Sequence, residues 1–168
     1  SAGENHSCGV LVDGSVECWG DDTVNYGYIW APNGSFVSVS AGAIHSCGIR
    51  NDGSVACWGS NSYGKSSPPS GSFVSVSTGT NHSCGIRIDG SVECWGLDNN
   101  GQSSPPSGVF VDVSSGYYHS CGLRVDGSVE CWGSDSYGKS NTDFDDDGIN
   151  ILLDCDDSND ILLSIEFD

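Results

Sequence analysis

The chain has 168 residues, of which 23 are acidic and only 5 are lysine or arginine, so its formal net charge at pH 7 is −18. This balance excludes binding to nucleic acid and adhesion to anionic lipid, which need clustered cations, and no apolar run reaches the ~20 residues that span a bilayer, so we expect no membrane insertion. Hydrophobic residues amount to 36% and nine residues are cysteine, a composition typical of secreted or cell-surface proteins that are held together by disulfides.

One phrase recurs four times along the chain: His-Ser-Cys-Gly, then Asp-Gly-Ser-Val, then Cys-Trp-Gly. The copies begin at His6, His45, His82 and His119, so they follow one another at steps of 39, 37 and 37 residues. Recurrence at this period is typical of a repeat architecture. We therefore divide the chain into four repeats and a separate tail, with the boundaries 1–39, 40–76, 77–113, 114–141 and 142–168.

Each repeat is expected to form three short strands. The segments Phe73–Val76 and Cys84–Arg87 are rich in residues that favour β-structure, and Ser91–Trp95 follows an Asp-Gly turn. No segment has a sustained helical period. The sequence therefore predicts an all-β fold of four tandem, three-stranded, blade-like repeats.

The Asp-Gly turn predicts how the cysteines pair. In the second repeat, a three-residue loop at 51–53 closes a hairpin between Arg50 and Ser54, and three steps back along each strand Cys47 lies opposite Cys57. We expect this pair at a non-hydrogen-bonded site, where Cα atoms approach to about 4.5 Å, close enough for a disulfide. The same spacing predicts the disulfides Cys8–Cys18, Cys47–Cys57, Cys84–Cys94 and Cys121–Cys131.

The four histidines recur at one position of the repeat. A zinc site made from these His-x-Cys pairs is the alternative to the disulfides, but the repeats contain no Cys-x-x-Cys pair. We expect each histidine to make the same structural hydrogen bond in its repeat. The sequence also contains no hydrolase, metalloprotease or nucleotide-binding motif, so we do not expect an enzyme.

The repeat resembles a known family. The run from His45 to Gly59, followed by Asn61-Ser62-Tyr63-Gly64-Lys65 and Phe-Val-Ser-Val-Ser, resembles the regulator of chromosome condensation repeat over about 140 residues, and it is most similar to short, secreted variants such as a propeller that inhibits β-lactamase. The resemblance implies propeller blades that bind proteins on their faces. Members of the family are usually seven-bladed, whereas this chain has four repeats, so we expect an array that does not close and whose edges need covering.

The connection after the first repeat is longer than the others and carries three aromatic side chains. They are Tyr26, Tyr28 and Trp30. Tyrosine and tryptophan are enriched at protein interfaces, and terminal repeats also need caps over their exposed core. Both interpretations stay open: an interface with a partner, or a cap.

The tail contains a pattern typical of calcium loops. Carboxylates stand at positions 1, 3, 5 and 12 of a loop that has Gly148 at position 6, as in an EF-hand loop and in the aspartate-rich repeats of thrombospondin type 3, which the tail resembles. The predicted Ca²⁺ ligands are Asp143, Asp145, Asp147, the carbonyl of Ile149, and Asp154. The alternative is a solvated acidic linker.

The end of the chain carries two further features. Cys155 is the odd cysteine after four pairs, and in a secreted chain it indicates an intermolecular bridge or a free thiol. Residues 161–168 predict a strand, which either folds back over the last repeat or adds to the open edge of another chain. Its apolar side chains are Ile161, Leu163, Ile165 and Phe167.

Three Asn-x-Ser triplets, at Asn5, Asn33 and Asn81, predict possible glycosylation. Taken together, the sequence predicts a non-enzymatic, secreted, calcium-binding structural protein whose copies associate end to end into a homopolymer such as an extracellular filament or surface layer. The alternative is an extracellular propeller-type module that binds a protein or glycan, as an adhesin or inhibitor does.

Overall fold

The computed structural model describes residues 1–21 and 26–136. These residues form eleven antiparallel strands and one short 3₁₀ turn, η1 (Ser62–Gly64). The predicted all-β fold of tandem, blade-like repeats is confirmed. Within residues 1–21 and 26–136, the period of two in the strand segments and the turn residues between them leave no stretch long enough for an α-helix.

The strands make four sheets, which we call blades 1 to 4. Blade 1 has β1 (His6–Val10) and β2 (Val16–Gly20); blade 2 has β3 (Phe36–Ala41), β4 (His45–Arg50) and β5 (Val55–Gly59); blade 3 has β6 (Phe73–Thr78), β7 (His82–Arg87) and β8 (Val92–Gly96); blade 4 has β9 (Phe110–Ser115), β10 (His119–Arg124) and β11 (Val129–Gly133). In blades 2 to 4, the second strand in the chain is the middle strand of the sheet.

Blade 1 differs from the expected three strands. It has two strands and a single bridge between Ala2 and Ser7. The amino terminus of Ser1 donates to the Cys8 carbonyl at 2.8 Å, and the Cys8 amide donates to the Ser1 carbonyl at 2.9 Å. Residues 1 and 2 thus occupy only the last part of the position that the first strand fills in the other blades.

The sheets are also out of phase with the repeat boundaries drawn from the sequence. The boundary at 39/40 falls inside β3, and the boundary at 76/77 falls inside β6. The first strand of each blade pairs with the strand that follows it, so the blade begins at Phe36, Phe73 or Phe110. The His-Ser-Cys-Gly phrase is conspicuous in the sequence, but it belongs to the middle strand.

The hairpin turns form as expected. The Arg50 amide donates to the Ser54 carbonyl at 2.8 Å, and Gly53 takes a φ of +83°, which a residue with a Cβ adopts only under strain. The Asp52 carboxylate accepts from the amide and hydroxyl of Ser54, and the hydroxyl bond lowers the pKa of Asp52. The same Asp-to-Ser bonds are made by Asp13, Asp89 and Asp126.

All four predicted disulfides are present, and the zinc alternative is wrong. Cys47 lies directly opposite Cys57 in the β4–β5 register. The Cα atoms of the four pairs are 4.0–4.1 Å apart, which is the close approach of a non-hydrogen-bonded pair. Each cross-link closes a short loop and contributes about 2–3 kcal/mol.

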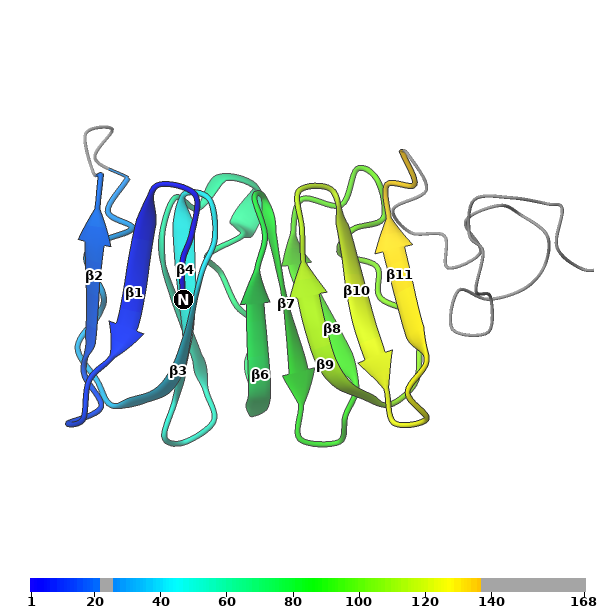
Figure 1. Ribbon diagram of the computed structural model, residues 1–168, viewed down its shortest axis with the longest axis horizontal. Helices are drawn as coiled ribbons and strands as arrows, with labels where there is room; N and C mark the ends of the chain where they lie inside the picture. The colour runs from blue at the N-terminus through cyan, green and yellow to red at the C-terminus, as the bar shows by residue number, and fades with distance from the viewer. Residues whose placement is uncertain (22–25, 137–168) are drawn as a thin grey trace, which may run out of the picture.

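The blades stand side by side in chain order (Figure 1). Blade 1 lies at one end of the row and blade 4 lies at the other. Each blade therefore contacts the blades next to it in the sequence, and the described residues form an open array, as the repeat number predicts.

Candidate functional site

Each blade has two unlike faces, and these faces make the core. The disulfide face carries the cystine and aliphatic side chains, and the aromatic face of the next blade carries a phenylalanine and a tryptophan. Between blades 2 and 3, the disulfide face contributes Cys47, Ile49, Val55 and Cys57, and the aromatic face contributes Phe73, Val76 and Trp95. The interfaces between blades 1 and 2 and between blades 3 and 4 repeat the cystine, the aliphatic side chains, the phenylalanine and the tryptophan, and the interface between blades 1 and 2 also includes Ala31, Ala41 and Ala56. The core is thus three copies of one interface.

The two aromatic rings of each aromatic face pack edge to face. Phe73 and Trp95 have ring centroids 6.1 Å apart with planes at 65°, a favoured geometry for an aromatic pair. The Phe36–Trp58 and Phe110–Trp132 pairs repeat it. Burying a side chain of this size contributes about 1.5–3 kcal/mol, so the aromatic face is a main source of stability between blades.

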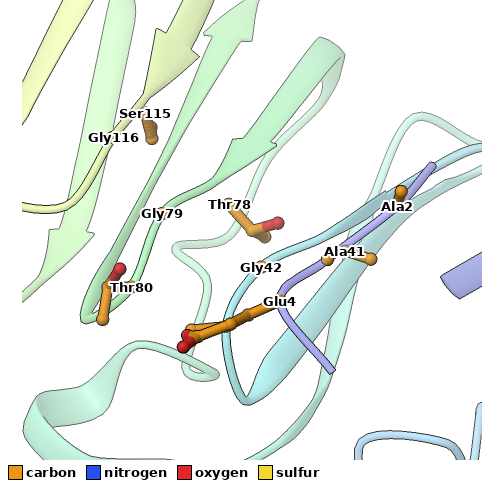
Figure 2. A pocket seen from close by; sticks show the side chains of 11 residues that line it. Ala2, Glu4, Ala41, Gly42, Thr78, Gly79, Thr80, Ser115 and Gly116 are labelled. Carbon is orange, nitrogen blue, oxygen red and sulfur yellow. The ribbon is translucent and has the colours of Figure 1, made fainter. Parts of the chain in front are cut away.

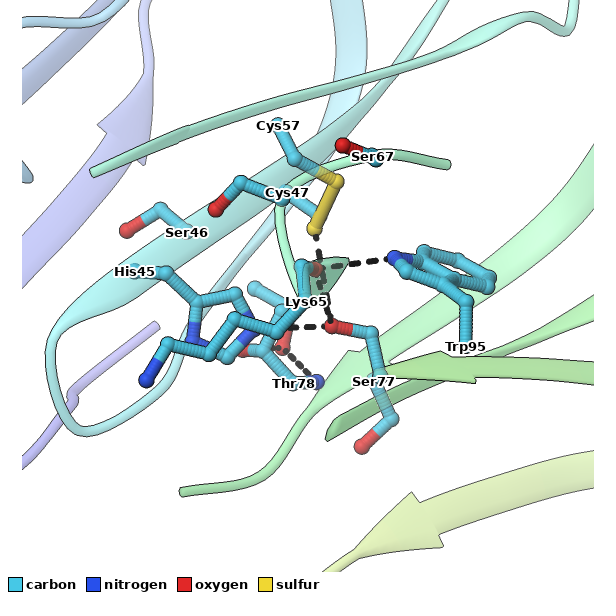
Figure 3. Close-up of a disulfide and its surroundings, with 12 residues drawn as sticks. His45, Ser46, Cys47, Cys57, Lys65, Ser67, Ser77, Thr78 and Trp95 are labelled. Carbon is cyan, nitrogen blue, oxygen red and sulfur yellow. Dashed lines mark hydrogen bonds between the residues drawn. A yellow bond between two sulfur atoms is a disulfide. The ribbon is translucent and has the colours of Figure 1, made fainter. Parts of the chain in front are cut away.

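A buried wedge residue from each connection completes the interface. The wedge residues are Tyr28, Lys65 and Gln102, and all three side chains are fully buried. The Lys65 carbonyl accepts from Trp95 Nε1 at 2.9 Å (Figure 3), and the Tyr28 and Gln102 carbonyls accept from the indoles of blades 2 and 4. Lys65 Nζ donates to Asn81 Oδ1 at 2.9 Å, and burial lowers the pKa of Lys65.

The sequence singled out Tyr28 but did not show that Tyr28, Lys65 and Gln102 occupy one position, because a phenol, an ammonium group and an amide have different side-chain chemistry. A signal was present at the preceding position, where glycine occurs each time: Gly27, Gly64 and Gly101. Each of these glycines has a positive φ. The shared backbone turn, rather than the wedge side chain, is what the repeat preserves.

The repeated histidine makes one bond across each interface. His45 Nε2 lies 2.8 Å from the Ser83 hydroxyl oxygen of the next blade. The corresponding pairs are His6–Ser46 (2.7 Å) and His82–Ser120 (2.8 Å). The prediction of a shared structural hydrogen bond is confirmed for these three histidines.

The histidines inside the array are held neutral. The Ser83 hydroxyl also lies 3.3 Å from the Lys65 carbonyl oxygen, and a bond donated to that oxygen favours the His45 tautomer with the proton on Nε2. Nδ1 of His45 and of His82 is buried and has no hydrogen-bond partner among the described residues. Burial, reinforced by the charge of Lys65, lowers the pKa of His45 to about 3, and burial lowers the pKa of His82 to about 4. These rings are therefore not proton carriers near neutral pH.

Small residues let neighbouring blades approach closely at the turn between the first and second strands of each blade, which we call the inner end of the blade. A Cβ on Gly42 would lie 2.5 Å from the Gly79 carbonyl oxygen, and one on Gly79 would lie 2.3 Å from the Gly116 carbonyl oxygen. The amide of Ala43 donates to that Gly79 carbonyl at 3.4 Å. Successive blades are thus joined backbone to backbone along this edge.

A shallow groove of about 230 Å³ runs along these inner ends (Figure 2). Among the described residues that line it, Glu4 is the sole titratable side chain, and the rest are alanine, glycine, serine and threonine. An acid–base pair or a nucleophile activated by a base needs at least two such groups in reach. The described residues of the groove lining supply one such group, the Glu4 carboxylate.

The arginines have structural partners. Arg50, Arg87 and Arg124 each lie over the phenylalanine ring of their own blade, with guanidinium-to-centroid distances of 4.8, 4.6 and 4.5 Å. Arg87 and Arg124 also pair with the carboxylates of Glu93 and Glu130. These cations stabilise blades and do not form a basic surface.

The two ends of the array expose one face each. At the blade 1 end, Trp19 is 59% exposed, whereas Trp58, Trp95 and Trp132 are only 7–8% exposed. At the blade 4 end, Leu123 of the disulfide face is 37% exposed, although its counterparts are 1–2% exposed. The counterparts of Leu123 are Ile49 and Ile86. Trp19 does not stand out in the sequence, because its repeat has the same Cys-Trp-Gly motif as the others.

The three aromatic side chains of the first connection differ in exposure. Tyr28 is buried inside the chain, its hydroxyl donates to the Asp21 carbonyl, and its ring lies 4.6 Å from that of His6. Its assignment to an intermolecular interface is therefore wrong, because it fills the space between blades 1 and 2. Tyr26 and Trp30 are exposed.

The predicted glycosylation sites also differ in their surroundings. Asn5 and Asn33 are exposed. Asn81 binds Lys65 Nζ through its side chain, and Ser83 of its triplet is fully buried in an interface. This packing argues against glycosylation at Asn81.

The remaining predicted sites lie outside the described residues. They are the calcium ligands Asp143, Asp145, Asp147, Ile149 and Asp154, the odd Cys155, and the strand with Ile161, Leu163, Ile165 and Phe167. Within residues 1–21 and 26–136, no group of three His, Cys, Asp or Glu side chains could hold a metal ion.

The fold and the interfaces define a class of protein: tandem blades of the propeller type, packed disulfide face on aromatic face. The model of the regulator of chromosome condensation (RCC1) repeat matches residues 36–65, 73–102 and 110–139. The chain belongs to this repeat family. Each match starts at the first strand of a blade, in phase with the sheets. No curated protein sequence matches the chain.

Solved structures resemble the chain. It is 34% identical to the CRINKLY WD40 ectodomain of the Arabidopsis thaliana receptor kinase ACR4, with a TM-score of 0.67 over 79% of this chain and 49% of that one. The Physcomitrella patens receptor kinase CR4 ectodomain gives 34% identity and a TM-score of 0.67 over 79% and 37%. Prp20p of Saccharomyces cerevisiae, at 17% identity, shares the fold with a TM-score of 0.72 over 89% and 47%.

The chain spans half the length of these relatives or less. In the part of the chain that the structure describes, no helix is long and apolar enough to cross a membrane. The four disulfides are typical of proteins in an oxidising compartment.

Proposed function

We propose that this chain is a non-enzymatic, extracellular structural module whose copies associate end to end through the terminal blades. The observation that carries the proposal is the exposure of Trp19, since the same residue is buried by a neighbouring blade at three other positions. An exposed apolar half of an interface marks a site of association. In a repeat protein, such an end needs a cap or a partner.

An extracellular location is supported by two observations. Four disulfides, one per blade, persist only where thiols are not kept reduced. The two relatives with 34% identity are ectodomains of receptor kinases. The proposal therefore places the chain in a secreted or cell-surface protein.

The absence of catalysis is supported by the states of the candidate groups. His45 and His82 are buried, neutral and bonded to serines whose hydroxyls already donate to backbone carbonyls. The groove offers Glu4 without a second titratable side chain among its described lining residues. Binding is thus the activity that these surfaces suit.

The acidic tail is proposed to bind Ca²⁺ through Asp143, Asp145, Asp147, the Ile149 carbonyl and Asp154. Alternating carboxylates suit this hard cation, and a bound ion would reduce the repulsion between chains of charge −18. Cys155 and the strand at 161–168 are proposed to strengthen contacts between copies. These roles rest on the spacing of the residues in the sequence.

A second candidate function is the binding of a protein or glycan. Tyr117 and Tyr118 are both exposed, with ring centroids 4.2 Å apart, beside Gly116 in the groove lining. Exposed tyrosines are enriched at recognition surfaces because they offer large contact areas at low entropic cost. The pair directly follows Gly116 in the sequence, so it is a candidate contact for a ligand that extends from the groove.

Light scattering coupled to gel filtration tests the proposed function. The chain should give species larger than its monomer mass of 17.5 kDa, and their proportion should rise with concentration and with Ca²⁺. Replacing Asp145 and Asp147 by alanine should remove the Ca²⁺ effect and leave the basal association. A monomer at every concentration, with Ca²⁺ and with chelator, would reject self-association and favour the binding module.

A further inference from the structure

We infer that two copies join in a polar, head-to-tail manner: the disulfide face of blade 4 in one copy packs on the Trp19 face of blade 1 in the next. This inference rests on the proposed self-association and specifies its surfaces. The Trp19 face carries Trp19 and Glu17 on β2 and Gly9 on β1. The blade 4 disulfide face consists of Cys121, Leu123, Val129 and Cys131.

The interface already exists three times inside the chain. Every blade that has a successor covers its cystine with the aromatic face of that successor. In these interfaces Cys47 and Cys84 are completely buried, and the tryptophan opposite keeps only 7–8% of its surface exposed. A surface that fits its neighbour at three consecutive steps is expected to fit the same surface when a second copy presents it.

The ends of the array expose the two unlike halves of this interface. Blade 4 has no successor in the described chain, and Leu123 is 37% exposed. Blade 1 has no predecessor there, and Trp19 is 59% exposed. The exposed aliphatic surface at one end therefore matches the exposed indole at the other end in chemistry.

Blade 1 also has open space on this face. In blades 2 to 4 a phenylalanine ring crowds the middle-strand glycine, with a Cβ on Gly48 falling 2.7 Å from Phe36. At the equivalent Gly9, the nearest side chain is Trp19 itself, at 3.8 Å. Because the phenylalanine is missing here, the intermolecular contact is smaller than the internal ones, and we expect it to be reversible.

We assign a second copy as the occupant because the two faces match in chemistry and do not meet between the described blades of one chain. Blades 1 and 4 stand at opposite ends of the row (Figure 1). The faces are unlike, so a two-fold dimer would place Trp19 against Trp19 and leave both disulfide faces exposed. A heterologous contact uses both ends and repeats, which gives a ring if the rotation closes and a filament if it does not.

A mixing experiment with two singly blocked copies tests the polarity. Trp19→Asp places a carboxylate on the blade 1 face, and Leu123→Asp places one on the blade 4 face. Each variant alone should be monomeric by light scattering, because only one functional face remains. An equimolar mixture should form a species of twice the monomer mass of 17.5 kDa and none larger, since one copy supplies each intact face.

Matched controls come from the hairpin tips. Val12→Asp and Val125→Asp add the same charge at exposed apolar residues. The equivalent Ile88 stays exposed although blade 4 covers its own blade, so this position lies outside the interface. Both control variants should assemble like the unaltered chain. All measurements use moderate salt, because copies of charge −18 repel one another.

The outcomes separate the inference from the proposed function. If the unaltered chain is monomeric, both fail. If it associates and Leu123→Asp still dimerises alone, the contact is two-fold and the inference is overturned.

If it associates but the mixture stays monomeric, we turn to hydroxyl-radical footprinting of the unaltered chain, which requires no variant to fold. Oxidation of Trp19 and Leu123 should fall together as concentration rises, while that of exposed Trp30 stays constant; unchanged oxidation of Trp19 and Leu123 overturns the inference.

Discussion

Blade 3 and blade 1 carry nearly the same phrase, yet they differ in what surrounds it. In blade 3, Cys84 is covered by blade 4 and Trp95 by blade 2, so both faces are buried. In blade 1, Cys8 is buried against blade 2, whereas Trp19 on the other face is largely exposed. A blade of this kind is therefore stabilised by its neighbours more than by its own hairpins.

The largest effect is expected from removing the same side chain at the two positions. Trp95→Ala deletes a buried indole, its bond to the Lys65 carbonyl and its packing on Phe73, and should lower the free energy of unfolding by about 3–5 kcal/mol. Trp19→Ala should lower it by less than about 1 kcal/mol, because the residue is mostly exposed. Denaturant unfolding of monomeric, oxidised protein measures both.

Equal losses at the two tryptophans would show that neighbouring blades do not stabilise blade 3 more than blade 1. A matched control is Trp30→Ala, which removes a third indole that is also exposed. Its effect should resemble that of Trp19→Ala in a dilute sample. Only Trp19→Ala should also weaken association.

The second-largest effect is expected from acid, which should weaken the buried interfaces between blades. The pKa of His45 is about 3 and that of His82 about 4, both below the ordinary 6.5 of the unfolded chain, because burial disfavours the charged ring. Between pH 6.5 and about 4 these two histidines are protonated in the unfolded chain and neutral in the native chain, so the free energy of unfolding falls as pH falls. The loss is about 1.4 kcal/mol per pH unit and per histidine, or about 3 kcal/mol for both at pH 5.5.

Unfolding curves at pH 7.5 and 5.5 measure this loss. His45→Asn removes one of the two histidines with these lowered pKa values, and should reduce the slope of the free energy of unfolding against pH by about 1.4 kcal/mol per pH unit, whatever it does to stability at pH 7.5. A slope that is unchanged in His45→Asn would show that the buried imidazole is not its source. The turn aspartates, whose pKa values lie below 3.8, lose their stabilising bonds only at lower pH.

The hairpins and disulfides were predictable because local chemistry decides them. A three-residue Asp-Gly turn fixes the register of the two strands, and the register alone brings Cys47 opposite Cys57. The same holds for the other three pairs, which are ten residues apart. No knowledge of the neighbouring blades is needed for this step.

The interfaces were harder to predict because they depend on residues far apart in the sequence. Lys65 and Trp95 meet although 30 residues separate them, and the wedge position tolerates tyrosine, lysine and glutamine. The exposure of Trp19 depends on whether a blade precedes it, which its own repeat cannot report. Interface and cap stayed open for Tyr28 for the same reason, since an aromatic side chain in a connection can turn outward or inward, and Tyr28 turns inward.

The smallest effect is expected where backbones meet. Gly79→Ala would place a Cβ 2.3 Å from the Gly116 carbonyl oxygen of the next blade, so the two backbones must separate, and we expect a loss of about 2 kcal/mol. In Gly116→Ala the new Cβ would lie 2.8 Å from the His119 ring, as the Cβ of Gly79→Ala would lie 2.9 Å from the His82 ring. No backbone of a following blade lies against Gly116 within the described residues, so the loss should be about 1 kcal/mol. Thermal unfolding of the two variants side by side compares an internal edge with a terminal one. If both variants lose the same free energy of unfolding, the backbone of the neighbouring blade contributes nothing at this edge. If the loss in Gly116→Ala grows only at concentrations where copies associate, the terminal edge contacts the backbone of a second copy.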